Sequence, residues 1–148
     1  MHPFPHTYRV SATLARDGEA MVSAERLPSI ATAAPVEFDG PGDRWSPEML
    51  LLAALADCLL LSFRAVSRAA RFEFQHLDCR VEGTLERVGG FAQFSGFRTH
   101  ATLTVAPGAD PDRARKLLET AERQCLIARS LKGPGHLDCE IVTAAAGA

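Results

Sequence analysis

Residues 46–63 read SPEMLLLAALADCLLLSF, and this stretch decides the fold of the chain. Ser46 can cap the free N–H groups of a helix, Pro47 suits the first helical position, and Glu48 suits the positive end of the helix dipole. The following residues are apolar almost all round, and we expect the helix to continue to about Arg71. A helix that is apolar on most sides is buried on most sides. In 148 residues, that burial requires a wrapping sheet or a second subunit.

Before this helix, the sequence predicts two short strands. Residues 6–14 and 19–27 are the predicted strands, joined by a turn at Arg16-Asp17-Gly18. Residues 28–45 contain closely spaced proline and glycine residues, which predict an irregular connection.

After the helix, two alternating segments at 76–88 and 93–106 predict a hairpin with one polar face, which favours an antiparallel sheet. A second helix is expected from Asp110-Pro111 until just before Gly133, and a last strand at 136–143. This order of elements predicts an α+β fold in which antiparallel sheets surround a long buried helix, within a single domain covering residues 1–148.

Composition limits the function classes. The chain is 47% hydrophobic and 23% charged with a net charge of −2, as in soluble globular proteins. No basic run indicates a nucleic-acid surface. The N-terminus lacks the pattern of a signal peptide, and the apolar stretch from Met49 to Phe63 is shorter than a membrane span and contains Asp57. We therefore expect a cytoplasmic protein without a membrane or nucleic-acid partner.

Four cysteines are the candidates for chemistry, and no two of them form a Cys-x-x-Cys pair. The usual zinc spacing is therefore missing, and structural disulfides are rare in the cytosol. Cys79 and Cys139 lie on the apolar faces of predicted strands, where packed thiols are common. Cys58 and Cys125 lie on apolar helical stripes. From the residues alone, this second pair is either two inert core thiols or a redox pair.

A repeated tetrapeptide suggests one alternative, a metal-binding module. His-Leu-Asp-Cys occurs at 76–79 and again at 136–139, so that His76, Asp78, His136 and Asp138 could be ligands. On a strand, however, the histidine and the aspartate point away from the following cysteine. A single segment therefore cannot bring its own ligands together, and we assign no metal.

A thiol that attacks peroxide must be a thiolate near neutral pH. Cys58 is about twelve residues into its predicted helix, too far from the end for the dipole of that helix to act on it. The sequence therefore predicts that a cation from another part of the chain activates Cys58.

Three motifs resemble the OsmC/Ohr family. The first is PVEFDGPGDRWSPEMLLLAALADCLLLSF at 35–63, in which a glycine-rich loop leads to a Ser-Pro-Glu helix start and a cysteine ten residues after the glutamate. The second is ERQCLIARSLKG around Cys125, and the third is the Arg16-Asp17-Gly18 turn. They occur in the order that the family has and account for most of the chain.

The resemblance implies an organic hydroperoxide reductase that needs no cofactor. It implies a peroxidatic Cys58, a resolving Cys125, and an Arg16/Glu48 pair that polarises the site. The resulting disulfide would be reset by a dithiol reductant, of the lipoyl type or a small thiol. The resemblance also implies an intertwined homodimer with sites at the interface. Glu48 and Cys58 are ten residues, or about 15 Å, apart along one helix. Either the Arg16/Glu48 pair therefore reaches Cys58 across a subunit interface, which the intertwined dimer suits, or Glu48 acts only through Arg16.

Two residues, Leu126 and Asp57, bear on the roles that the resemblance implies for the cysteines. The family usually has proline directly after the second cysteine, where this chain has Leu126, and Asp57 places a carboxylate next to Cys58 in the sequence. A carboxylate facing the sulfur would disfavour the thiolate. These features leave open a second hypothesis, a non-enzymatic relative that binds an apolar ligand at the dimer interface.

Overall fold

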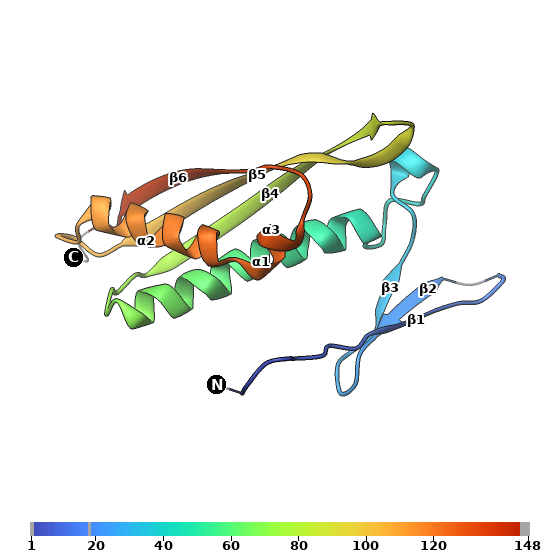
Figure 1. Cartoon of the computed structure of the whole chain (residues 1–148), viewed down its shortest axis with the longest axis horizontal. Helices are drawn as coiled ribbons and strands as arrows, with labels where there is room; N and C mark the ends of the chain where they lie inside the picture. The colour runs from blue at the N-terminus through green and yellow to red at the C-terminus, as the bar shows by residue number, and fades with distance from the viewer. Residues whose placement is uncertain (1, 18, 146–148) are drawn as a thin grey trace. The chain divides into compact units, whose positions relative to one another are not determined.

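A computed structural model describes residues 2–17 and 19–145 of the chain (Figure 1). The chain forms two compact units, residues 1–51 and residues 52–148. The single-domain organisation expected from the sequence stays a prediction.

The first unit contains a small antiparallel sheet with the strand order β1-β2-β3, formed by Ser11–Leu14, Ala20–Ser23 and Ile30–Thr32. The first two strands fall inside their predicted ranges but are shorter, and Arg16 and Asp17 lie in a turn as predicted. Gly18, the third residue of that turn, lies outside the described residues. The prediction of an irregular connection over residues 28–45 is wrong near its start, because residues 30–32 form the strand β3.

The glycine-rich loop between β3 and the long helix is tightly folded. It contains a short 3-10 helix, η1 (Val36–Phe38), and the Gly40 N–H donates to the Pro35 carbonyl at 3.0 Å. A Cβ at Gly40 would collide with the Ala34 carbonyl, so this position requires glycine. The loop ends at Ser46, whose Oγ accepts the Met49 N–H at 3.2 Å, which confirms the predicted cap.

The long helix α1 spans Pro47–Ala69, close to its predicted range. Only one stripe of it is buried within the chain: Leu55, Leu59, Phe63 and Ser67. The single chain alone does not supply the burial on most sides expected from the sequence, since Leu61 remains 45% exposed, and burial by a second subunit stays a prediction. By length and composition α1 could also cross a membrane, a test that the core helix of a soluble protein passes equally well.

The second unit is a three-stranded sheet with the order β4-β5-β6, formed by His76–Val88, Phe91–Val105 and Gly135–Thr143. The β4–β5 hairpin is antiparallel as predicted. The last strand falls where the sequence predicts it, and its direction, which the sequence left unassigned, is parallel to β5. The reason is the connection between them: residues 106–134 cross over with two helices, α2 (Pro111–Gln124) and α3 (Leu126–Ser130), and so return the chain in the same direction.

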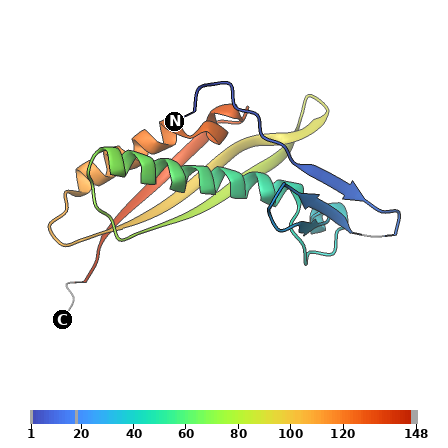
Figure 2. The same ribbon diagram turned by 90° about the horizontal axis from the view of Figure 1, so that it is seen from below.

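Helices cover one face of this sheet (Figure 2). The core joins Leu59 and Phe63 of α1 to Leu103 of β5 and Leu118 of α2, which are at most 3% exposed. At Gly83 of β4 the helix comes so close that a Cβ would lie 2.8 Å from the Leu52 side chain. The close approach at Gly83 therefore packs α1 against the sheet at Leu52, near the start of the helix.

Candidate active site

The structure brings two of the predicted site residues together. Cys58 and Cys125 belong to the same small apolar cluster between α1 and the sheet, around Leu55 and Phe97. Cys125 is 1% exposed and Cys58 is half-buried, and both are free thiols that act as hydrogen-bond partners of each other. Two sulfur atoms from separate parts of the chain are thus in contact.

The sequence predicts that Cys125 lies within one long helix. The structure instead places it between two helices. Its backbone is extended (φ −62°, ψ 112°), so that α2 ends before it and α3 begins after it. Its N–H donates to the Glu122 carbonyl at 3.0 Å, and its Sγ accepts the Ala128 N–H at 3.5 Å. Cys125 therefore caps both helices, and the first N–H groups of α3 point toward the thiol pair.

The pKa of Cys58 is lowered from its ordinary value by hydrogen bonds. Burial acts in the opposite direction and raises the pKa, but the backbone N–H of Ile127, the Cys125 thiol, the Ser62 hydroxyl and the backbone N–H of Leu126 together outweigh it. Hydrogen bonds to the charged form stabilise a thiolate. Cys58 is therefore the thiol of this pair that loses its proton more easily.

Burial raises the pKa of Cys125 to about 11. The Ala128 N–H opposes that rise, and the neighbouring Cys58 adds to it. The proton of the pair consequently stays on Cys125, which donates it to the Cys58 sulfur. The two thiols have opposite tendencies although they are in contact.

The donors that act on Cys58 differ from the cation predicted from the sequence. Ser62 follows Cys58 by four residues, one helical turn, and that spacing could have identified it. The amides of Leu126 and Ile127 could not be identified in this way, because the break at Cys125 is not visible in the helical periodicity. Leu126 is informative in retrospect, since proline at this position would have no N–H to donate.

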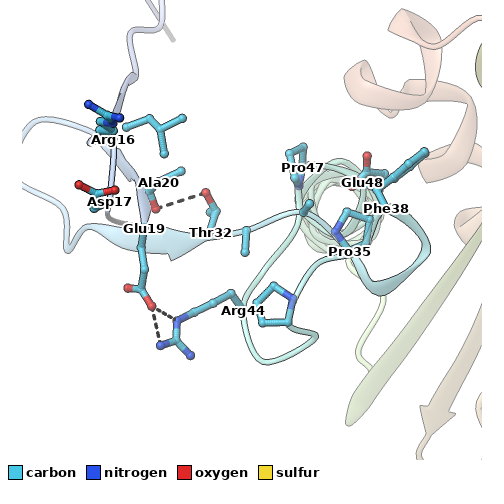
Figure 3. A pocket seen from close by; sticks show the side chains of 14 residues that line it. Arg16, Asp17, Glu19, Ala20, Thr32, Pro35, Phe38, Arg44, Pro47 and Glu48 are labelled. Atoms are coloured by element: carbon cyan, nitrogen blue, oxygen red, sulfur yellow. Dashed lines mark hydrogen bonds and ion pairs between the residues drawn. The ribbon is translucent and has the colours of Figure 1, made fainter.

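The other two predicted site residues line a pocket in the first unit (Figure 3). This open pocket has a volume of about 730 Å³ and is lined by Arg16 and Glu48 together with apolar residues such as Phe38. Arg16 and Glu48 lie on opposite sides of it, and no ion pair joins them within the described residues. The predicted Arg16/Glu48 pair therefore stays a prediction.

Glu48 has a buried carboxylate oxygen, Oε2, without a hydrogen-bond partner. A buried polar atom without a partner costs free energy, so this oxygen is suited to accept a donor from outside its present contacts. A second cation also lines the pocket: Arg44 binds Glu19 through Nε at 2.8 Å and through Nη2 at 2.6 Å. Sequence reasoning missed this ion pair, which joins residues 25 positions apart.

Cys79 and Cys139 have a different setting from the first pair. They lie on β4 and β6, each opposite Ala101 of the strand between them. Burial raises the pKa of Cys79 to about 11 and also raises that of Cys139. Both agree with the prediction of packed thiols on the apolar face of the sheet.

The two His-x-Asp segments do not converge on a metal site. His76 lies opposite Thr104 of β5, and His136 lies opposite Arg98 of the same strand. These two positions on β5 are six residues, or about 20 Å, apart. Each histidine instead contacts the aspartate two residues on, at 3.2 Å for His76–Asp78 and 2.9 Å for His136–Asp138. No cluster of metal-binding side chains occurs among the described residues.

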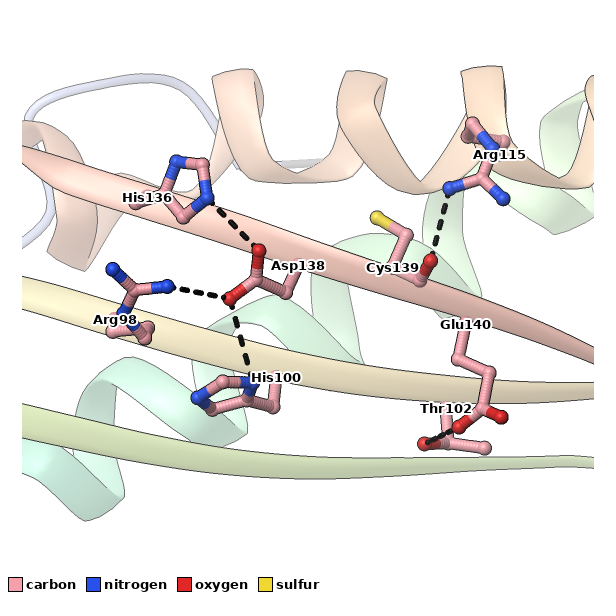
Figure 4. A network of polar contacts seen from close by, with 8 residues as sticks. All are labelled: Arg98, His100, Thr102, Arg115, His136, Asp138, Cys139 and Glu140. Atoms are coloured by element: carbon pink, nitrogen blue, oxygen red, sulfur yellow. Dashed lines mark hydrogen bonds and ion pairs between the residues drawn. The ribbon is translucent and has the colours of Figure 1, made fainter.

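Asp138 is the centre of a polar network on the other face of the sheet (Figure 4). Its carboxylate contacts Arg98 Nη1 at 3.1 Å, His100 Nδ1 at 3.4 Å and His136 Nε2 at 2.9 Å. Slight burial raises the pKa of Asp138, but the hydrogen bonds from His136 and Arg98 outweigh it and hold that pKa below its ordinary value. This network gives the face its polar character, and both carboxylate oxygens of Asp138 have partners in it.

Fold and site together define a small α+β protein that pairs two thiols beside a long apolar helix. The family described as OsmC-like protein matches residues 40–140, and the chain belongs to that family. The family resemblance predicted from the three motifs is thereby confirmed.

Similar proteins cover nearly the whole chain. An uncharacterized protein of Acinetobacter baylyi is 32% identical over 139 residues, which span 93% of this chain and 94% of that protein. An OsmC-like protein of unknown function from Vibrio cholerae has a TM-score of 0.83 at 16% identity, over 93% of this chain and 100% of that one. An organic hydroperoxide resistance protein OsmC from Legionella pneumophila has a TM-score of 0.71 at 22% identity, over 97% and 100%. The two structural likenesses show the fold.

Proposed function

We propose that the protein is a thiol-dependent peroxidase that reduces organic hydroperoxides through Cys58 and Cys125. The observation that carries the proposal is the unequal pair of thiols: a Cys58 whose pKa is lowered, in contact with a Cys125 that keeps its proton. Membership of the OsmC-like family and the likeness to an organic hydroperoxide resistance protein support the choice of substrate class.

In the proposed cycle, the Cys58 thiolate attacks one oxygen of the O–O bond. That bond breaks, the alkoxide leaves and takes a proton from water to become the alcohol, and Cys58 becomes a sulfenic acid. The Cys125 sulfur then attacks the Cys58 sulfur, the S–O bond breaks, and water and a disulfide form. A dithiol, of the lipoyl type or a small thiol, reduces the disulfide and is itself oxidised. The apolar residues around the pair, such as Leu55 and Phe97, favour an organic hydroperoxide over hydrogen peroxide.

A homodimer is part of the proposal. The single chain leaves large apolar side chains uncovered, among them Leu61 of α1 and Phe91 at the tip of the β4–β5 hairpin, which are 45% and 77% exposed. Exposed apolar surface of this extent marks an interaction site. The unsatisfied Oε2 of Glu48 supports a complete site in which an arginine, Arg16 in our proposal, becomes its partner and polarises the peroxide. We place this enzyme in the cytoplasm, where thiols are kept reduced.

The test is turnover of cumene hydroperoxide with a dithiol, together with the mass of the protein. One equivalent of hydroperoxide without reductant should remove two hydrogens and link the peptides that contain Cys58 and Cys125. An unchanged mass and no turnover would contradict the proposal. Saturable binding of an apolar ligand without turnover would instead support the non-enzymatic alternative. Sedimentation at several protein concentrations tests the dimer, and a single monomeric species would contradict it.

A further inference from the structure

A small cavity of about 50 Å³ lies beside Cys125. Apolar residues of α1 and β5 form part of its lining, and its polar side chains include Glu122 of α2 and Thr99 of β5. About 10–15 Å³ of accessible volume is enough for one water molecule, which also needs two to four polar partners. Three of the residues that line the cavity, Cys125, Glu122 and Thr99, carry a polar side-chain group that could serve as such a partner.

Glu122 is held next to Cys125 by the backbone. It lies three residues earlier, in the last turn of α2, its carbonyl accepts the Cys125 N–H at 3.0 Å, and both residues line the cavity. Its side chain is half-buried, and its carboxylate makes no ion pair or side-chain hydrogen bond within the part of the chain that the structure describes. A half-buried carboxylate that stabilises no structural partner is available for proton transfer.

We propose that Glu122 is the general base that takes the proton from Cys125, through water in this cavity, when Cys125 closes the disulfide with Cys58. The inference rests on the proposed function for its biological setting. It assigns a role to a residue that none of the three sequence motifs identified as functional.

The Cys125 proton passes through water to the Glu122 carboxylate, and the Cys125 sulfur uses the freed electron pair to attack the sulfur of the Cys58 sulfenic acid. The S–S bond forms as the S–O bond breaks. The departing hydroxide takes up a proton, which Glu122 returns, and leaves as water. No oxidant is needed beyond the hydroperoxide that formed the sulfenic acid.

The resolving thiol needs such help because the pKa of Cys125 is about 11, so that hardly any thiolate exists at neutral pH. Burial raises the pKa of Glu122 from its ordinary value, which makes its carboxylate a stronger base. His136 of β6 and Arg123 lower that pKa, and Glu119 raises it. The Cys139 thiol of β6 is the remaining titratable neighbour of Glu122.

The test isolates attack by Cys125 from the reaction with peroxide. In a Cys79→Ala, Cys139→Ala background, 2,2′-dithiodipyridine first caps Cys58 as a mixed disulfide. Attack by Cys125 then releases a second thiopyridone, whose absorbance gives the rate of disulfide closure. A Cys125→Ser variant, which should lack this second phase, identifies the signal.

Glu122→Gln should slow this second phase at pH 7 by at least about tenfold, as expected for loss of a general base. The difference should shrink as the pH approaches the pKa of Cys125, because hydroxide then removes the proton directly. Glu119→Gln is the matched control, since it removes the same charge one turn earlier on α2, and its rate should stay within about twofold. Glu122→Asp should restore part of the rate because it keeps a carboxylate.

Equal rates for Glu122→Gln and the parent protein over the whole pH range would overturn the inference, as would an equal loss in Glu119→Gln. A separate addition of cumene hydroperoxide tests the proposed function. A second phase that depends on Glu122, without any sulfenic acid on Cys58 after hydroperoxide, would leave the base assignment standing and remove the peroxidase.

Discussion

The two cysteine pairs of this protein have similar apolar surroundings but different hydrogen-bond donors. Cys79 and Cys139 are held on the sheet, each opposite Ala101, and burial raises the pKa of both. Cys58 is also partly buried, but the N–H groups at the start of α3 and the Ser62 hydroxyl lower its pKa. The comparison indicates that hydrogen-bond donors, two of them backbone N–H groups exposed by the break at Cys125, lower the pKa of a thiol that burial alone would raise.

The largest effect should follow from removing the first thiol. Cys58→Ser should reduce the turnover of organic hydroperoxide on the order of 10³-fold or more, because the attacking atom is gone. Steady-state turnover with a dithiol measures this loss. Cys79→Ser, which changes the same atom in the other pair, is the control and should retain activity. Activity that survives in Cys58→Ser would end the distinction between the pairs.

Removal of the second thiol should have the next largest effect. Cys125→Ser should still form a sulfenic acid on Cys58, but without a partner thiol this acid is oxidised further to the irreversible sulfinic form. We expect the activity left after repeated additions of hydroperoxide to fall by about tenfold. Mass spectrometry should find a gain of two oxygens on the Cys58 peptide. A variant that remains fully active and unmodified would show that Cys125 does not resolve the intermediate.

The pH dependence of alkylation should separate the two pairs in the folded protein. A lowered pKa means that Cys58 loses its proton at a lower pH than an ordinary cysteine, whereas the Cys79 proton leaves only as the pH approaches 11. Because the thiolate is the nucleophile, iodoacetamide at pH 7 should modify Cys58 before Cys79. A short pulse followed by peptide mass spectrometry gives both rates. Equal rates at pH 7 would contradict the assignment of the donors.

The smallest effect should come from the sheet thiols. Cys79→Ala should change turnover by less than about twofold and lower the free energy of unfolding by about 1 kcal/mol, as is typical of a small change in a packed position. Urea unfolding of the variant and the parent protein measures the stability. A large loss of activity without a loss of stability would show that the sheet pair takes part in the chemistry.

Much of this architecture could be predicted from the sequence because it depends on local patterns. The Ser46 cap, the length of α1 and the β4–β5 hairpin follow from capping chemistry and from apolar periodicity. The parallel β6 could not be predicted in this way, since the direction of a strand depends on how its connection crosses the sheet.

The candidate site was only partly predictable for a similar reason. The family motifs identified Cys58 and Cys125, and the structure brings them into contact. The donors to Cys58 come from α3, which exists as a separate helix because the backbone is extended at Cys125. An apolar stripe at helical spacing continues through that break without a signal, so periodicity predicted one uninterrupted helix.

The crossover between β5 and β6 also sets when, during synthesis, the surroundings of Cys58 are completed. Cys58 leaves the ribosome well before residues 106–134, which carry both the amides of α3 and Cys125. Until this segment is made, the nascent chain lacks the α3 amides and the Cys125 thiol, and only the Ser62 hydroxyl is already present to act on Cys58. A single late segment therefore supplies both the backbone donors that lower the pKa of Cys58 and the second thiol of the pair.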